Sequence, residues 1–83
     1  MIKFEATMES GKKVQSIVDE YAMHLVGIEI DGGAEPTELD IYTWIMASKV
    51  FMAKDADGNK LLCVGSKVET IRKIAPKDWF KNS

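Results

Sequence analysis

The sequence predicts an α+β fold, a small antiparallel sheet with one or two short helices, in a single domain of residues 1–83. Three observations predict this class. Residues 2–8 alternate apolar and polar side chains with the period of a strand that buries one face. Asp57-Gly58 separates two apolar runs, as in a hairpin turn, and Thr37 with Asp40 is typical of a helix start. The sheet is expected to stay open or to form a partly open barrel.

The first predicted strand continues into a hairpin. Residues 9–11, Glu-Ser-Gly, offer a glycine where a type I turn with a bulge needs a positive φ. Pairing with residues 12–18 would then set Ile2 opposite Val18 and Ala6 opposite Val14.

Residues 14–25 also fit an amphipathic helix, and the two interpretations exclude each other over this stretch. Apolar residues recur there at helical spacing: Val14, Ile17, Val18, Tyr21, Ala22 and Leu25. β-Branched residues crowd the first turns, and Lys12 and Lys13 would lie at the positive end of the helix dipole. These points favour the hairpin, but the sequence leaves both interpretations open.

The middle of the chain predicts a strand, a loop and a helix. Residues 26–31 alternate again and indicate a strand. Residues 32–36, rich in glycine with a proline, break regular structure and indicate a loop. A helix should follow Thr37, and the apolar residues expected on its buried face are Leu39, Ile41, Tyr42, Trp44 and Ile45.

The C-terminal half predicts a second hairpin and a last strand. Residues 50–53 and 60–64 flank the Asp-Gly turn. Ser66 and Glu69 have the spacing of a capping box, whereas the β-branched content of residues 68–74 suits a strand, so one helical turn leading into a strand is expected. The inward-facing apolar residues form the expected core: Ile2, Phe4, Val18, Ile28, Ile30, Trp44, Ile45, Phe51, Leu62, Val64 and Ile71.

Composition limits the class of protein. Hydrophobic residues make up 46% of the chain and charged residues 29%, which is typical of a globular domain rather than a disordered one. A single cysteine, Cys63, permits no intrachain disulfide and favours a reducing compartment. With no apolar run of bilayer length and no signal-peptide pattern, a cytoplasmic location and no membrane partner are expected.

Charge is unevenly distributed along the chain. Residues 1–40 carry three lysines and nine acids, a net charge of −6, whereas residues 41–83 carry eight basic residues and four acids, a net charge of +4. Such an asymmetry can orient a charged partner or a second copy of the chain. The simpler interpretation is that the charges mix on one solvated surface after folding.

The sequence contains no recognisable catalytic or metal-binding constellation, so we expect a protein that is not an enzyme and uses no metal or cofactor. Residues 55–59 have alternating oxygen ligands, but they lack the third ligand and the final glutamate of a calcium loop. The single cysteine, Cys63, and the single histidine, His24, lie far apart in sequence, so they are a weak signal for a catalytic pair. The apolar strand around Cys63 indicates a core residue instead.

Aromatic and basic residues of the C-terminal half are the candidate binding residues. They are Trp44, Arg72, Lys73, Lys77, Trp79 and Phe80. Aromatic residues are enriched at protein interfaces, which favours a non-catalytic protein-binding module. Aromatics beside cations also suit single-stranded nucleic acid, the alternative function, although a pI of about 5.3 is low for a dedicated nucleic-acid binder. Exposed sheet edges make a homodimer a further hypothesis.

Residues 2–13 and 63–74, IKFEATMESGKK and CVGSKVETIRKI, resemble the opening hairpin and closing strand of many small uncharacterised phage and prophage proteins. The resemblance covers under a third of the chain and assigns no functional residue. It implies a protein that binds a host or phage protein as an inhibitor or accessory factor, or one that sequesters a small ligand.

Overall fold

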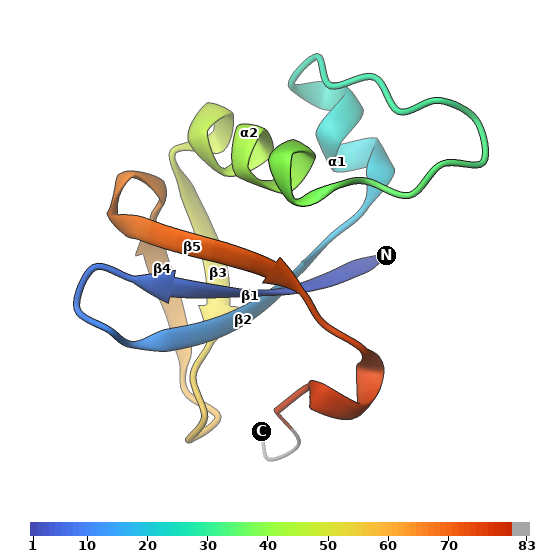
Figure 1. Cartoon of the computed structure of the whole chain (residues 1–83). Helices are drawn as coiled ribbons and strands as arrows, with labels where there is room; N and C mark the ends of the chain where they lie inside the picture. Colours follow the sequence, from blue (N-terminus) through green and yellow to red (C-terminus); the bar gives the residue numbers. More distant parts are fainter. Residues whose placement is uncertain (81–83) are drawn as a thin grey trace.

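The computed structural model describes residues 1–80 and shows an open five-stranded antiparallel sheet with two helices on one face (Figure 1). The strand order is β4-β3-β2-β1-β5, so β4 and β5 are the edges. This confirms the predicted α+β class, but the edges do not meet and the sheet does not close into a barrel. The elements in chain order, with η for a 3-10 turn, are β1 (Ile2–Met8), β2 (Lys13–Val18), α1 (Glu20–Leu25), α2 (Glu38–Ser48), β3 (Val50–Lys54), β4 (Lys60–Val64), η1 (Gly65–Lys67), β5 (Val68–Lys73) and η2 (Pro76–Asp78).

The hairpin of β1 and β2 has the predicted register. Ile2 lies opposite Val18 and Ala6 opposite Val14. The turn between the strands depends on Gly11, whose φ of 88° few other residues adopt without strain. Its amide donates to the Met8 carbonyl at 2.8 Å, which closes the turn.

Each interpretation of residues 14–25 is correct for one half of the stretch. The strand continues to Val18, and α1 begins at Glu20 after Asp19 accepts a hydrogen bond from the Ala22 amide at 2.7 Å. The capping carboxylate of Asp19 therefore fixes the switch from strand to helix. It also separates Val14 and Val18, which are buried on the sheet, from Met23, which α1 buries.

The strand predicted for residues 26–31 is wrong. This segment leaves α1 through a turn and runs on the helix side of the molecule (Figure 1). Within residues 1–80 it joins no strand of the sheet, so it forms no ladder. Its alternation still has a packing role, because Ile28 and Ile30 are half-buried against the core.

Helix α2 begins as predicted with a capping box. The Thr37 hydroxyl accepts from the Asp40 amide at 3.2 Å, and the Asp40 carboxylate accepts from the Thr37 amide at 2.8 Å. Only one side of α2 rests on the sheet, and it buries Ile41 and Ile45, one turn apart. Leu39 and Tyr42, expected on the buried face, are exposed.

The hairpin of β3 and β4 turns at Gly58, with φ of 84°, as predicted. Within it, the buried Asp55 carboxylate accepts from the Asp57 and Asn59 amides, both at 3.0 Å, and lies 3.4 Å from the Lys12 ammonium. Burial opposes ionisation, but the hydrogen bonds from Asn59, Lys12 and Asp57 outweigh it and lower the pKa of Asp55. The Asp55 carboxylate therefore shapes the turn.

Two predicted core residues of β4, Leu62 and Val64, are exposed instead. Period-2 alternation directs Leu61 and Cys63 toward the helices, so their neighbours point to the opposite face. The run Leu61-Leu62-Cys63-Val64 is apolar on both faces, and its pattern cannot show which face is covered. The 3-10 turn η1 then leads into β5 as expected, but without the predicted Ser66–Glu69 cap.

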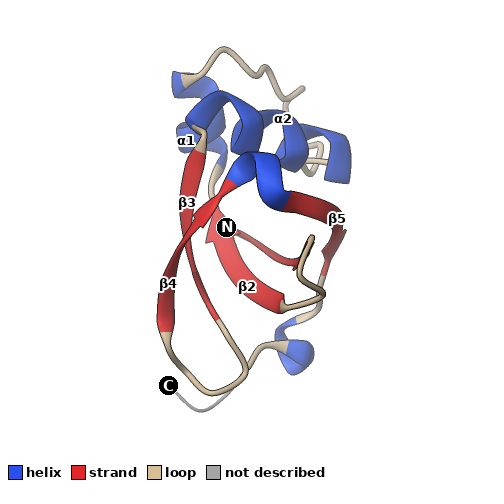
Figure 2. Cartoon of the chain, turned by 90° about the vertical axis from the view of Figure 1, so that its left-hand side faces the viewer, coloured by secondary structure: helices blue, strands red, loops and turns tan. Residues whose placement is uncertain are grey.

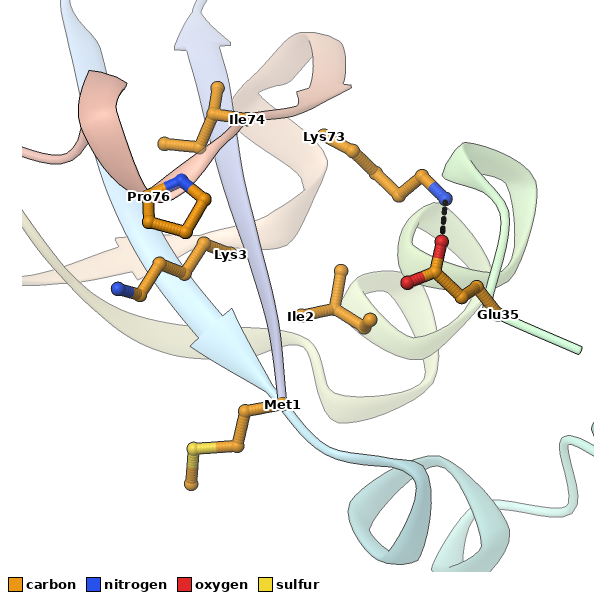
Figure 3. Close-up of a pocket in the computed structure, with 7 residues that line it drawn as sticks. All are labelled: Met1, Ile2, Lys3, Glu35, Lys73, Ile74 and Pro76. Atoms are coloured by element: carbon orange, nitrogen blue, oxygen red, sulfur yellow. Dashed lines mark ion pairs between the residues drawn. The ribbon is translucent and has the colours of Figure 1, made fainter. Parts of the chain in front are cut away.

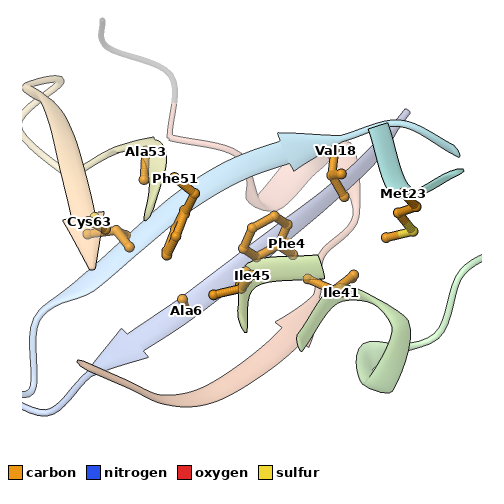
Figure 4. Packing of buried hydrophobic residues seen from close by; sticks show 10 residues of the cluster. Phe4, Ala6, Val18, Met23, Ile41, Ile45, Phe51, Ala53 and Cys63 are labelled. Carbon is orange, nitrogen blue, oxygen red and sulfur yellow. The ribbon is translucent and has the colours of Figure 1, made fainter. Parts of the chain in front are cut away.

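The core lies between the sheet and α2 (Figure 4). The Phe4 and Phe51 rings meet at its centre, 6.0 Å apart between centroids. Its buried apolar residues are Phe4, Ala6, Val14, Val18, Met23, Ile41, Ile45, Phe51, Ala53 and Cys63. Gly65 passes directly under the end of α2, where an added Cβ would lie 2.9 Å from both the Ile45 carbonyl oxygen and its Cγ2.

We expect Gly65→Ala to lower the free energy of unfolding by about 1–3 kcal/mol, because the new methyl group collides with helix backbone that cannot move away cheaply. Urea denaturation followed by circular dichroism measures the effect. Gly32→Ala is the matched control, since nothing lies within 4 Å of a Cβ there and Gly32 does not have a positive φ. Equal stability of the two variants would contradict the close approach of Gly65 to α2.

We expect Asp55→Asn to destabilise the protein near neutral pH and to lose most of that effect in acid. The folded-state pKa of Asp55 lies below the ordinary value of 3.8, so the ionised carboxylate stabilises the fold above that value, and this contribution disappears as the pH falls through the folded-state pKa. Urea midpoints at about pH 6 and about pH 2 measure it. Asp57→Asn, which changes an exposed acid in the same turn, is the control. If wild type remained more stable than Asp55→Asn at the lower pH, the ionised carboxylate of Asp55 would not be the source of the stabilisation.

Candidate functional site

The face of the sheet opposite the helices is the candidate surface. Strand alternation places on it the neighbours of the core residues. Figure 1 shows both helices on the other side of the sheet and η2 on this side. The side chains that the strands direct to this open face are Lys3, Glu5 and Thr7 of β1, Lys13, Gln15 and Ile17 of β2, Val50, Met52 and Lys54 of β3, Lys60, Leu62 and Val64 of β4, and Thr70 and Arg72 of β5.

Gln15 is the centre of a polar network on the open face. It is only 1% exposed, and its Nε2 donates to Glu5 Oε2 at 3.1 Å and to the Asp78 carbonyl at 3.0 Å. Its Oε1 accepts from the Phe80 amide at 2.7 Å. Arg72 Nε donates to the other Glu5 oxygen at 3.0 Å. The network therefore fastens the segment of residues 76–80, called here the C-terminal strap, to β1 and β2.

Trp79 packs back onto the sheet within this strap. The ammonium groups of Lys3 and Lys54 lie over its ring, 5.1 and 4.3 Å from the centroid, in cation–π geometry. Lys54 also donates to the Phe80 carbonyl at 2.6 Å. Trp79 and Phe80 are both half-buried, so the strap is part of the folded domain.

An exposed apolar area lies beside the strap. It consists of large side chains on adjacent strands, with Met52 directly opposite Leu62 and Val50 directly opposite Val64. We call the set of Ile17, Val50, Met52, Leu62 and Val64 the apolar sheet patch; all five are exposed. A groove of about 360 Å³ adjoins the patch at Ile17 and Met52 and is bounded by Trp79, with Lys54 and Lys60 also in its lining.

Strand β4 borders this patch as a free edge (Figure 2). The Asp55 N–H donates to the Asn59 carbonyl at 3.0 Å, and the Gly65 N–H donates to the Lys49 carbonyl at 2.7 Å. These two bonds show which residue pairs of the β3–β4 hairpin exchange backbone hydrogen bonds. By antiparallel alternation, Leu61 and Cys63 bond to β3, and the backbone groups of Lys60, Leu62 and Val64 point outward. The outward groups and the exposed side chains thus belong to the same three residues.

The structure does not gather the six sequence-predicted site residues on one surface. Trp44 lies on α2, half-buried against the core, and Lys73 donates to the Pro36 carbonyl at 3.0 Å on the helix side. Arg72 pairs with Glu5 on the open face, and Lys77 is exposed on η2. Only Trp79 and Phe80 line or adjoin the groove.

The sequence prediction missed Gln15, which holds the strap, and Glu5, which binds Gln15. It also missed Met52, Leu62 and the β4 edge. Glu5 and Gln15 face each other in the predicted register, so this pair could have been found from the first hairpin alone. Nothing in the sequence near them indicates that residues 78–80 would supply the remaining hydrogen-bond partners.

A second hollow, of about 480 Å³, lies where β1 begins (Figure 3). Ile2, Ile74 and Pro76 supply its apolar walls, and Lys73 crosses its rim to Glu35 at 3.8 Å. Since Glu35 is well exposed, this ion pair is weak. The Lys73 ammonium also donates to the Pro36 carbonyl, so this side chain ties β5 to the loop before α2.

The Cys63 thiol is part of the core and His24 is exposed on α1. Burial raises the pKa of Cys63, with the Lys12 charge opposing this only in part, so the thiol is protonated at neutral pH. Within residues 1–80, no group of three or more His, Cys, Asp or Glu side chains is arranged to hold a metal ion. No helix in the described part of the chain is long and apolar enough to cross a membrane.

Comparison of the chain with protein-family models, with curated proteins and with solved structures finds no match.

We expect Gln15→Ala to destabilise the protein by about 2 kcal/mol and to release the strap, because Glu5 and the Phe80 amide lose a buried partner. In a Trp44→Phe background, Trp79 is the only tryptophan, so its fluorescence should shift to the red on release. Thr70→Ala, an exposed polar residue on the same face, is the control. An unshifted Trp79 emission in Gln15→Ala would show that other contacts hold the strap.

Proposed function

We propose that this chain is a non-catalytic protein-binding module that takes up an extended segment of another protein along β4. The observation that carries the proposal is that Lys60–Val64 combines exposed apolar side chains with a backbone edge that no other strand of residues 1–80 pairs. An added strand would bond to the outward groups of Lys60, Leu62 and Val64 and would cover Leu62 and Val64. Such a module acts by occupying its partner, as an inhibitor or an accessory subunit does.

The contrast between the two sheet edges supports β4 as the binding edge. Strand β5 contains Glu69, Arg72 and Lys73, and its ladder with β1 shifts register at Thr7/Met8. Charged side chains and bulges are the usual protection of an edge against pairing. Strand β4 has one charged residue, Lys60, no proline and no register shift.

The groove beside Trp79 offers less to a nucleic acid. A base would have to stack on the indole ring, but Lys3 and Lys54 already lie over that ring. Single-stranded nucleic acid, the alternative from the sequence, is therefore an outcome that the test must distinguish rather than the leading function.

The test compares two exposed leucines. Leu62 is 65% exposed on β4 and Leu39 is 71% exposed on α2, so both should accept glutamate without unfolding. After affinity capture from the native host's extract and identification of the partner, calorimetric titration with the purified partner should show that Leu62→Glu weakens binding at least about tenfold. Leu39→Glu should bind within about twofold of wild type.

A second pair of variants tests strand addition itself. Leu62→Pro removes an outward N–H together with the side chain, whereas Leu62→Ala removes the side chain alone. We expect the proline variant to bind about tenfold more weakly than the alanine variant. Equal binding by Leu62→Glu and wild type would contradict the proposal, as would recovery that depends on nuclease-sensitive material and disappears at high salt. A dimer that Leu62→Glu dissociates would instead identify a second copy as the occupant.

A further inference from the structure

The two layers of the molecule carry opposite charge. The strand residues on the open face include five cations and one acid: Lys3, Lys13, Lys54, Lys60, Arg72 and Glu5. The stretch that forms the helix layer, residues 19–49, contains seven acids and one lysine. Folding thus converts the charge asymmetry of the sequence into a cationic binding face behind an acidic layer, and clustered charge selects partners of the opposite sign.

Lys60 is the cation best placed to meet a bound segment. It lies directly opposite Lys54 in the β3–β4 ladder, and like charges at such positions destabilise a sheet. Its side chain forms no ion pair within residues 1–80. It also stands on the edge strand and lines the same groove as Lys54. An anion beside β4 would give Lys60 the counter-charge that residues 1–80 do not supply.

We propose that the segment bound by β4 is acidic and carries one acid and two apolar residues at alternate positions. This inference rests on the proposed function. Residues paired across neighbouring strands share a face, so the three partner residues beside Lys60, Leu62 and Val64 all lie on the open face. The partner's acid lies beside Lys60, and its apolar residues cover Leu62 and Val64. A parallel segment then reads acid-x-apolar-x-apolar, and an antiparallel one reads apolar-x-apolar-x-acid.

The same charges argue against a second copy as the occupant. Two-fold pairing of β4 about Leu62 would set Lys60 of each copy beside Val64 of the other. It would also align two cationic faces in one continuous sheet, with no acid of either strand near Lys60. A segment of different sequence provides the carboxylate that a second copy lacks.

A displayed library of random peptides about nine residues long, selected on immobilised full-length protein, tests the inference. Wild type should enrich peptides with one acid and two apolar residues at alternate positions. Lys60→Glu should keep the apolar pair but replace the acid by lysine or arginine. Leu62→Glu should lose the enrichment. Lys77→Glu, the same charge change at an exposed residue of η2 outside the patch, should select the wild-type pattern.

Charge exchange on one selected peptide completes the test. Replacing the peptide's acid by lysine should weaken binding to wild type about tenfold and restore most of it on Lys60→Glu. Enrichment of apolar pairs with no acid at the expected position would overturn the inference and leave the proposed function intact. Peptides enriched equally by wild type and Leu62→Glu, or binding of an oligothymidylate probe in their place, would overturn both.

Discussion

The contact between Phe4 and Phe51 joins two parts of the sheet that the backbone hardly connects. Strands β2 and β3 share a single residue pair, Gln15 with Lys54, whereas the other neighbouring strands pair over five or six residues. The β3–β4 hairpin is therefore placed mainly by side-chain packing, with Phe51 held against Phe4 under Ile45 of α2 (Figure 4). Since this hairpin carries both the apolar sheet patch and the β4 edge, the geometry of the binding surface depends on that aromatic contact.

The C-terminal strap reinforces the same joint from the opposite face. Both residues of the lone β2–β3 pair also hydrogen-bond to the strap, since the Gln15 side chain binds Asp78 and Phe80 and the Lys54 ammonium binds Phe80. Burying polar groups such as Gln15 and Glu5 is favourable only when each has partners. Within residues 1–80 no buried side-chain polar atom lacks one. Apolar packing on one face and a satisfied polar network on the other thus fix the hairpin together.

Local patterns predicted the fold better than they predicted the site. The register of β1 with β2, the Asp-Gly hairpin and the Thr37 cap each depend on residues close in sequence, and all three are confirmed. The strand assigned to residues 26–31 failed because alternation cannot show whether a free edge is within reach. The sequence predicts Leu62 in the core because β4 is apolar on both faces, and only the position of the helices distinguishes the two faces.

The site failed to emerge from the sequence for a related reason. The sequence groups Trp44 with Trp79 because both are large aromatics near lysines. Helix α2 carries Trp44 to the helix side, however, and the strap brings Trp79 to the open face. Neither the pairing of Gln15 with residues 78–80 nor the exposure of β4 follows from local spacing. Both depend on which face the chain covers, and that is decided by the tertiary arrangement.

Helix α2 presents a competing apolar surface, and its comparison with β4 shows why exposure alone does not define a binding site. Leu39, Tyr42 and Met46 are exposed along its outer side. Single exposed apolar residues are common on small domains, which cannot cover every face. A helix, however, satisfies its own backbone groups, so a partner lying on α2 gains only side-chain burial. At β4 a partner gains that burial and also bonds to backbone groups that the fold leaves free, beside a lysine that lacks a counter-charge in residues 1–80. Side-chain burial, backbone bonding and charge therefore all favour the same three residues, Lys60, Leu62 and Val64.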